Sequence, residues 1–173
     1  MMEINKDNIK EYAKRYDNDY INTEDETIEK ELKEWLKVHR YLDREKFIKI
    51  GLWKSKRPTK HYKNNDDLTV REITQFCLAT KSEQARIEPL TVLNGVSYPV
   101  ASVILHFAFP DKYPIMDVRA ISSLGWEQPK SYNFNFWKKY CEKIQNISRE
   151  TGEDLRTIDK ALWKYDKEQN SST

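Results

Sequence analysis

The chain has 173 residues, of which 38% are hydrophobic and 34% charged, and its mean hydropathy is -0.88. No stretch approaches the roughly 18 consecutive apolar residues of a membrane-spanning helix, and the polar start lacks the apolar core of a secretory signal. Two cysteines, Cys77 and Cys141, are too few for a disulfide framework or a four-thiolate metal site. We therefore expect a soluble cytoplasmic protein that folds as one compact unit over residues 1–173.

The net charge is only +2, but the basic residues are unevenly distributed. Between Gly51 and Asn65 there is no acidic residue, and this stretch holds the basic residues Lys54, Lys56, Arg57, Lys60 and Lys63. A local basic stretch on a nearly neutral protein indicates a limited contact with phosphate or another anion. The alternative is a solvated loop that binds nothing.

Helical periodicity is the main structural signal in the chain. Only four glycines occur, which favours helices over turn-rich β structure. Apolar residues recur at helical spacing in several segments, namely 27–42, 69–80, the residues after Ser82, 134–147 and 153–165. Thr69 and Glu72 have the spacing of a capping box that would start the second of these helices. The sequence predicts an all-α fold, with residues 1–20 and 167–173 at its periphery.

The segment Leu90–Leu105 has the pattern of two helices joined by a tight turn at Asn94 and Gly95. Pro99 falls in the first turn of the second helix, where a missing N–H group removes no hydrogen bond. The backbone N–H groups of such a turn, together with the positive end of the helix dipole, favour phosphate binding.

A loop with two prolines follows, and the apolar pair Ile115 and Met116 is expected to bury it. Asp117 stands directly before a further helical pattern, and its ordinary role there would be that of an N-cap.

Together these two segments resemble the helix-hairpin-helix DNA glycosylases, the superfamily of endonuclease III and the adenine glycosylases. Leu93-Asn94-Gly95-Val96-Ser97 is similar to the family's Leu-Pro-Gly-Val-Gly hairpin, Val100-Ala101 to the helix start, and Pro114-Ile115-Met116-Asp117 to the loop that holds the catalytic aspartate. The spacing matches without a gap. The resemblance covers about Leu90 to Leu124, and it implies two helical lobes: a helix-hairpin-helix lobe over 69–126, and a second lobe over 21–68 and 127–166.

The sequence departs from the family pattern in three ways, and two of these exclude a chemistry or a cofactor that other members have. Asn94 and Ser97 replace the hairpin proline and its second glycine. Pro99 stands where bifunctional members carry their Schiff-base lysine, so lyase chemistry at that position is excluded. The cysteines cannot form the iron–sulfur cluster of many members. The resemblance thus implies a monofunctional N-glycosylase without a cofactor, which removes a modified or damaged base flipped out of duplex DNA. We expect the protein to be a monomer.

The resemblance also assigns roles to individual residues. Asp117 would stabilise positive charge that develops on the sugar and would activate water. Trp53 and Trp126 are candidates for stacking against the flipped base, although a tryptophan is more often a core residue. Arg119 fits a phosphate contact and a pairing with an acid equally well. DNA phosphates would bind the hairpin and the basic stretch, at Asn94, Gly95, Val96, Ser97, Tyr98, Lys54, Lys56, Arg57 and Lys60.

Family members often hold a monovalent cation at the hairpin, which implies Na⁺ or K⁺ at the carbonyls of Leu93 and Gly95.

The residues leave two other functions open. One is a non-catalytic helix-hairpin-helix DNA-binding protein, in which Asp117 only caps a helix. The other is an all-α interaction protein whose basic stretch binds a protein or an anion.

Overall fold

The fold is described from a computed structural model of the chain, over residues 1–170. The protein is 71% helical and has no strand in these residues, which confirms the predicted all-α class. None of the helices in this part of the chain is both long and apolar enough to cross a bilayer. In chain order the elements are α1 (Lys6–Tyr20), α2 (Glu24–His39), α3 (Arg44–Lys54), α4 (Thr59–Lys63), α5 (Asp67–Ala79), α6 (Glu83–Ile87), the 3₁₀ helix η1 (Glu88–Val92), α7 (Tyr98–Ala108), α8 (Val118–Ser123), α9 (Phe134–Thr151) and α10 (Leu155–Asn170).

The helices form two compact units, each with its own core. Unit 1 combines Met1–Ile21 with the chain from Pro110 onward, and unit 2 is Asn22–Phe109. This division differs from the expected lobes over 69–126 and over 21–68 with 127–166. The reason is the packing of α7 on α2 and α3, which joins the hairpin to the helices before it, and of α8 on α10, which joins the Asp117 segment to the C-terminal helices.

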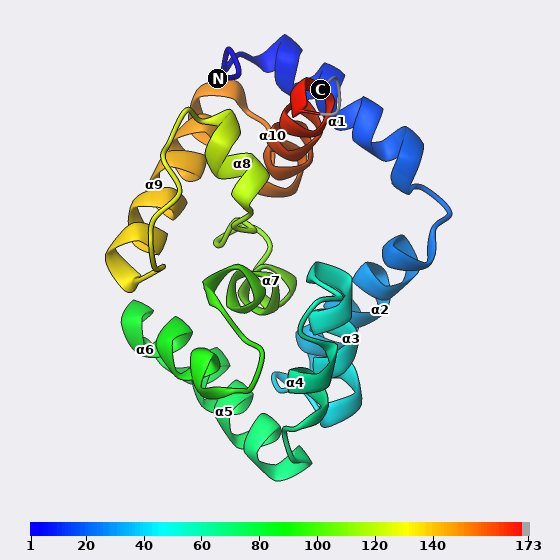
Figure 1. Ribbon diagram of the computed structural model, residues 1–173, viewed down its shortest axis with the longest axis vertical. Helices are drawn as coiled ribbons and strands as arrows, with labels where there is room; N and C mark the ends of the chain where they lie inside the picture. The colour runs from blue at the N-terminus through cyan, green and yellow to red at the C-terminus, as the bar shows by residue number, and fades with distance from the viewer. Residues whose placement is uncertain (171–173) are drawn as a thin grey trace. The chain divides into compact units, whose positions relative to one another are not determined.

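In unit 1 the first helix packs along the last, α1 beside α10 (Figure 1). Ile9 and Ala13 are buried in this contact, and the carboxylate of Asp17 lies 2.6 Å from the Lys160 ammonium. The prediction of a peripheral start was therefore wrong for α1, and α10 continues to Asn170. Residues 171–173 lie outside the described part of the chain. The sequence of α1 has few apolar residues, so its packing against α10 could not be predicted from the sequence.

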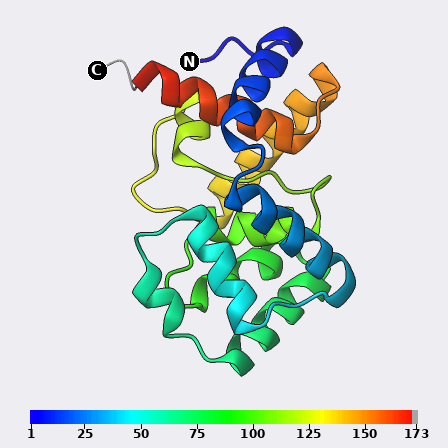
Figure 2. The ribbon, with the colours of Figure 1, turned by 90° about the vertical axis from the view of Figure 1, so that its right-hand side faces the viewer.

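Unit 2 is built around α7, which packs against α2 and α3 (Figure 2). Every residue of α7 except Pro99 is buried, and the side chains of Leu32, Leu36 and Phe47 from α2 and α3 are fully buried as well. Because α7 is fixed on several sides, the hairpin that precedes it is held by a rigid element.

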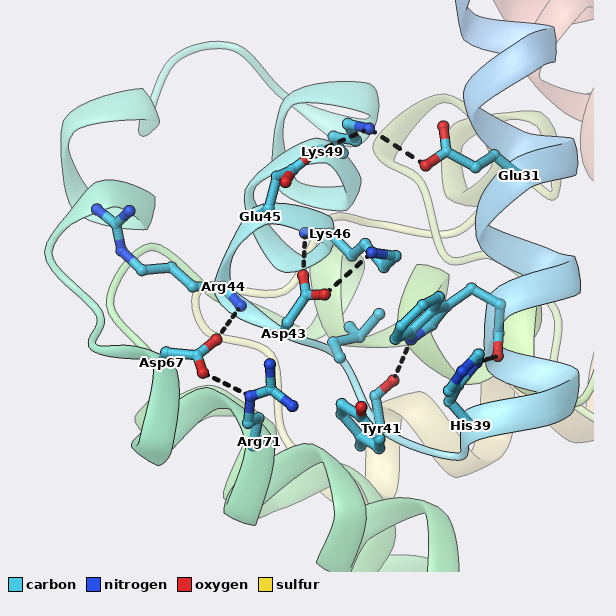
Figure 3. A network of polar contacts seen from close by, with 12 residues as sticks. Glu31, His39, Tyr41, Asp43, Arg44, Glu45, Lys46, Lys49, Asp67 and Arg71 are labelled. Atoms are coloured by element: carbon cyan, nitrogen blue, oxygen red, sulfur yellow. Dashed lines mark hydrogen bonds and ion pairs between the residues drawn. The ribbon is translucent and has the colours of Figure 1, made fainter.

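The start of α5 corrects one prediction. Its N-cap is Asp66, whose Oδ1 accepts the N–H of Thr69 at 2.9 Å, so the capping box at Thr69 and Glu72 was wrong. Figure 3 shows how this end of α5 is tied to α3. The N–H of Arg44 donates to the carboxylate of Asp67 at 2.8 Å, and the same carboxylate pairs with Arg71 at 2.5 Å.

Candidate nucleic-acid interface and candidate catalytic aspartate

The predicted hairpin is present in unit 2. The N–H of Val96 donates to the Leu93 carbonyl at 3.0 Å and closes the turn, and Gly95 has a φ of +86°. Pro99 lies in the first turn of α7, as the sequence indicated. The positive φ explains the glycine, because other residues rarely adopt this left-handed conformation.

The hairpin leaves several backbone donors open at the start of α7. Ser97 is the N-cap of this helix, but its side chain makes no capping hydrogen bond. Within residues 1–170 the N–H groups of Gly95 and Ser97 have no acceptor, and that of Tyr98, at the first helical position, has none inside the helix. Donors at a helix N-terminus are suited to an anion. The side chains of Val96 and Tyr98 are buried, so at these positions only the backbone is available.

The short helix α4 packs directly on the hairpin. The ring of Tyr62, fully buried, lies between Gly51 and Gly95: a Cβ added to either glycine would be 2.7 Å from a ring carbon. The Cβ of His61 would lie 3.1 Å from a Cβ on Gly95. The predicted basic stretch and the predicted hairpin are therefore neighbours in unit 2. Around this contact Lys56, Arg57, Lys60 and Lys63 are exposed, whereas Lys54 is half-buried.

Burial also affects the two tyrosines of this region. Desolvation raises the pKa of Tyr62 to about 12, and its hydroxyl has no hydrogen-bond partner among the described residues. Burial, together with the negative charge of Glu88, raises the pKa of Tyr98 to about 12. Both phenols are thus neutral at physiological pH and add no charge that would repel an anion.

Asp117 belongs to unit 1 and has the predicted N-cap role. Its Oδ1 accepts the N–H of Arg119 at 2.9 Å at the start of α8. The preceding loop is buried, and the Tyr140 hydroxyl donates to the Ile115 carbonyl at 3.0 Å, which fixes the loop two residues before the aspartate. Burial raises the pKa of Tyr140 well above its usual value, and the charges of Asp159 and Asp117 add to this effect. The N-cap bond and the fixed loop together make the Asp117 carboxylate rigid, and it is half-buried.

Arg119 pairs with an acid. Its guanidinium donates to the Asp166 carboxylate at 2.9 Å and lies over the ring of Trp163, 5.6 Å from the ring centre. Of the two roles that the sequence left open, the structure shows the ion pair.

The two candidate stacking residues lie in different units and different surroundings. Trp53 lines a hollow of about 530 Å³ between α2 and α3, its indole N–H donates to the Asp25 carbonyl at 3.0 Å, and its ring meets Phe107 edge to face. Trp126 packs edge to face against Phe136 and Tyr140 of α9. The structure thus places Trp53 at a hollow and gives Trp126 a packing role.

Sequence reasoning missed two residues of this region, Tyr62 and Asn65. Both lie in a polar stretch, between Lys60 and Asp66, that reads as a surface loop, yet both are buried against the hairpin. Neither belongs to a periodic apolar pattern, so no local signal pointed to them.

Comparison with known proteins adds one likeness. No family model matches the sequence, and no curated protein matches it. The solved structure of the Methanocaldococcus jannaschii 8-oxoguanine glycosylase/lyase, in complex with a 15mer DNA containing 8-oxoguanine, is similar in fold, with 19% identity and a TM-score of 0.49 over 93% of this chain and 81% of that chain. A likeness at this level does not establish a family, so the case for a function rests on the chain's own residues.

Proposed function

We propose that the chain binds duplex DNA through the hairpin and the neighbouring basic stretch of unit 2. The observation that carries this proposal is the contact between α4 and Gly95, because it places a helix with exposed cations next to the hairpin that has the open backbone donors. A DNA phosphate would accept from the N–H groups of Gly95, Ser97 and Tyr98. Lys56, Arg57 and Lys60 would add attraction to neighbouring phosphates that weakens as the salt concentration rises.

On this DNA we propose a monofunctional N-glycosylase activity that uses Asp117. Cleavage of an N-glycosidic bond creates positive charge on the sugar, and a rigid carboxylate beside it stabilises that charge and orients water. The N-cap bond to Arg119 occupies Oδ1, and such a bond holds a carboxylate in one orientation. Pro99 has no amine, so hydrolysis rather than a Schiff base at that position is the chemistry that fits.

Trp53 supports the proposal as the candidate residue that stacks against the flipped base. A base that leaves the duplex loses its stacking energy, and contact with an aromatic side chain compensates for part of that loss. Trp53 borders the hollow between α2 and α3, which is lined by Lys56 of the basic stretch and also by the acidic residues Glu24, Asp25 and Glu31.

A monovalent cation at the hairpin is also compatible with the residues present. The Leu93 carbonyl accepts one N–H, from Val96, and a carbonyl oxygen has two acceptor positions. Together with the Gly95 carbonyl it offers the hard oxygen ligands that Na⁺ and K⁺ prefer, and the bound ion would supply positive charge for a phosphate.

The activity is tested with duplexes that carry a panel of modified bases, followed by alkali to reveal abasic sites. Wild type is compared with Asp117→Asn and with a control, Asp111→Asn, which changes an exposed carboxylate of the same loop. We expect strand breaks that need alkali, retained in the control and reduced about 100-fold or more in Asp117→Asn. Equal activity of Asp117→Asn and wild type would refute the catalytic role.

The N-cap bond of Asp117 equally supports a second candidate, a non-catalytic DNA-binding protein. It predicts salt-sensitive binding to duplex DNA and no abasic sites with any duplex of the panel. Absence of both binding and cleavage would refute both functions.

A further inference from the structure

Asn65 is a buried amide in an otherwise exposed connection between α4 and α5. Its exposed fraction is 5%, whereas its neighbours Asn64 and Asp66 are exposed. Burying an amide costs free energy unless its donors and acceptor are hydrogen-bonded. The partners of Asn65 therefore indicate its role.

The Asn65 side chain pairs with the backbone of Asn94 in the hairpin, in both directions. Its Oδ1 accepts the Asn94 N–H at 2.7 Å, and its Nδ2 donates to the Asn94 carbonyl at 3.0 Å. The same Nδ2 donates to the carbonyls of Tyr62 at 3.0 Å and His61 at 3.3 Å in α4. Three carbonyls lie around the nitrogen and share its two N–H donors, and an N–H faces the oxygen, so only this orientation of the amide places donors opposite acceptors.

Arg44 fixes the backbone around Asn65 from the side of α3. Its guanidinium donates to the Asn65 carbonyl at 2.8 Å and to the Lys63 carbonyl at 2.7 Å. The backbone N–H of Arg44 is itself bound to Asp67, as Figure 3 shows. Asn65 thus connects a fixed point at the start of α3 with α4 and with the hairpin.

We infer that Asn65 is the positioning residue of the phosphate site. It holds both polar backbone groups of Asn94, the residue directly before Gly95, where the open N–H groups begin. It also holds the C-terminal end of α4, which carries exposed cations. Being buried, it touches no DNA and acts through Asn94. The inference rests on the proposed binding of phosphate at the hairpin.

Binding to a fluorescent duplex at several salt concentrations tests the inference, with Asn65→Ala compared with Asn64→Ala, which changes the exposed asparagine at the preceding position. We expect Asn65→Ala to lose about tenfold in affinity at every salt concentration. The slope of log K against log salt stays at the wild-type value, because no cation is removed and Arg44 still holds the Lys63 carbonyl at the end of α4. Lys60→Ala, in contrast, reduces the steepness of that slope by about 0.9. Wild-type affinity of Asn65→Ala, or a slope reduced as in Lys60→Ala, would overturn the inference.

Amide hydrogen exchange gives a readout that does not depend on DNA. We expect slow exchange of the Asn94 amide in the wild type, and fast exchange in Asn65→Ala while Ile104 in the middle of α7 stays protected. If Asn65→Ala does not fold, Asn65→Asp takes its place, since it keeps the shape and the acceptor for Asn94 but turns an oxygen toward the carbonyls. Fast exchange of the Asn94 amide in the wild type would refute the inference that Asn65 holds the Asn94 backbone. A protected Asn94 in a protein that does not bind duplex DNA refutes the proposed function instead.

Discussion

Replacement of Gly95 by alanine is the sharpest test of the hairpin geometry. Gly95 has a φ of +86°, and an added Cβ would lie 2.7 Å from Cδ1 and 2.9 Å from Cε1 of Tyr62. The substitution therefore combines backbone strain with overpacking. Two other glycines separate these effects. Gly152 has a φ of +75° with nothing within 4 Å of an added Cβ, whereas Gly51 is helical and meets the other edge of Tyr62 at 2.7 Å.

The expected costs follow from these geometries. A side chain in the left-handed region costs about 1–2 kcal/mol, and overpacking of a filled core costs about 1–3 kcal/mol. Gly152→Ala should lower the free energy of unfolding by the first amount alone. Gly51→Ala should lower it by the second, less up to about 1 kcal/mol that alanine gains in a helix. Gly95→Ala should lower it by both, about 2–5 kcal/mol.

Urea unfolding followed by circular dichroism measures the three variants, with tryptophan fluorescence as a second probe. A double variant, Gly95→Ala with Tyr62→Leu, should recover part of the overpacking cost, since a smaller side chain leaves room for the methyl group. The reasoning is refuted if Gly95→Ala is no less stable than Gly152→Ala, because the contact with Tyr62 would then contribute nothing.

Two further predictions concern single side chains of unit 2. Tyr62→Phe removes a buried hydroxyl that lacks a partner among the described residues and should raise the urea midpoint at pH 7. Burial raises the pKa of Tyr62 to about 12, so the unfolded chain releases this proton at a lower pH than the folded protein does, and stability is lost as the pH rises from about 10 to 12. Tyr62→Phe should make that loss smaller. An unchanged pH profile would contradict the burial of the Tyr62 hydroxyl as its cause. Asp66→Ala removes the observed N-cap of α5 and should lower the urea midpoint more than Thr69→Ala does. A larger decrease for Thr69→Ala would contradict this N-cap and favour the capping box predicted from the sequence. The pKa of Asp66 is lowered, chiefly by its hydrogen bonds from Thr69, so its contribution should be present at neutral pH and disappear in acid.

Three features encoded within a few residues were predictable from the sequence. The turn at Gly95, Pro99 in the first helical turn, and Asp117 as an N-cap all depend on neighbours in the chain, and the structure has each of them. The helix α1 was missed because its buried face pairs with α10, far away in the sequence.

The arrangement of the candidate DNA site was not predictable for the same reason. Asn65 bonds to Asn94 across 29 positions, and an asparagine beside charged residues reads as exposed. Tyr62 lies among basic residues, so its burial against two glycines has no local signature. The sequence indicated a basic stretch and a hairpin separately, and only tertiary packing placed them together.

The salt dependence of duplex DNA binding is the measurement that tests the account most directly. Fluorescence anisotropy of the wild type between about 50 and 200 mM salt should show binding, with log K falling as log salt rises. Replacing Lys56, Arg57 and Lys60 by alanine together should reduce the steepness by about 3, at about 0.9 per phosphate contact, while Lys37→Ala, an exposed lysine of α2, should leave it unchanged. Binding that is absent, or whose salt dependence is the same in the triple variant and the wild type, would contradict the claim that this surface of unit 2 holds DNA.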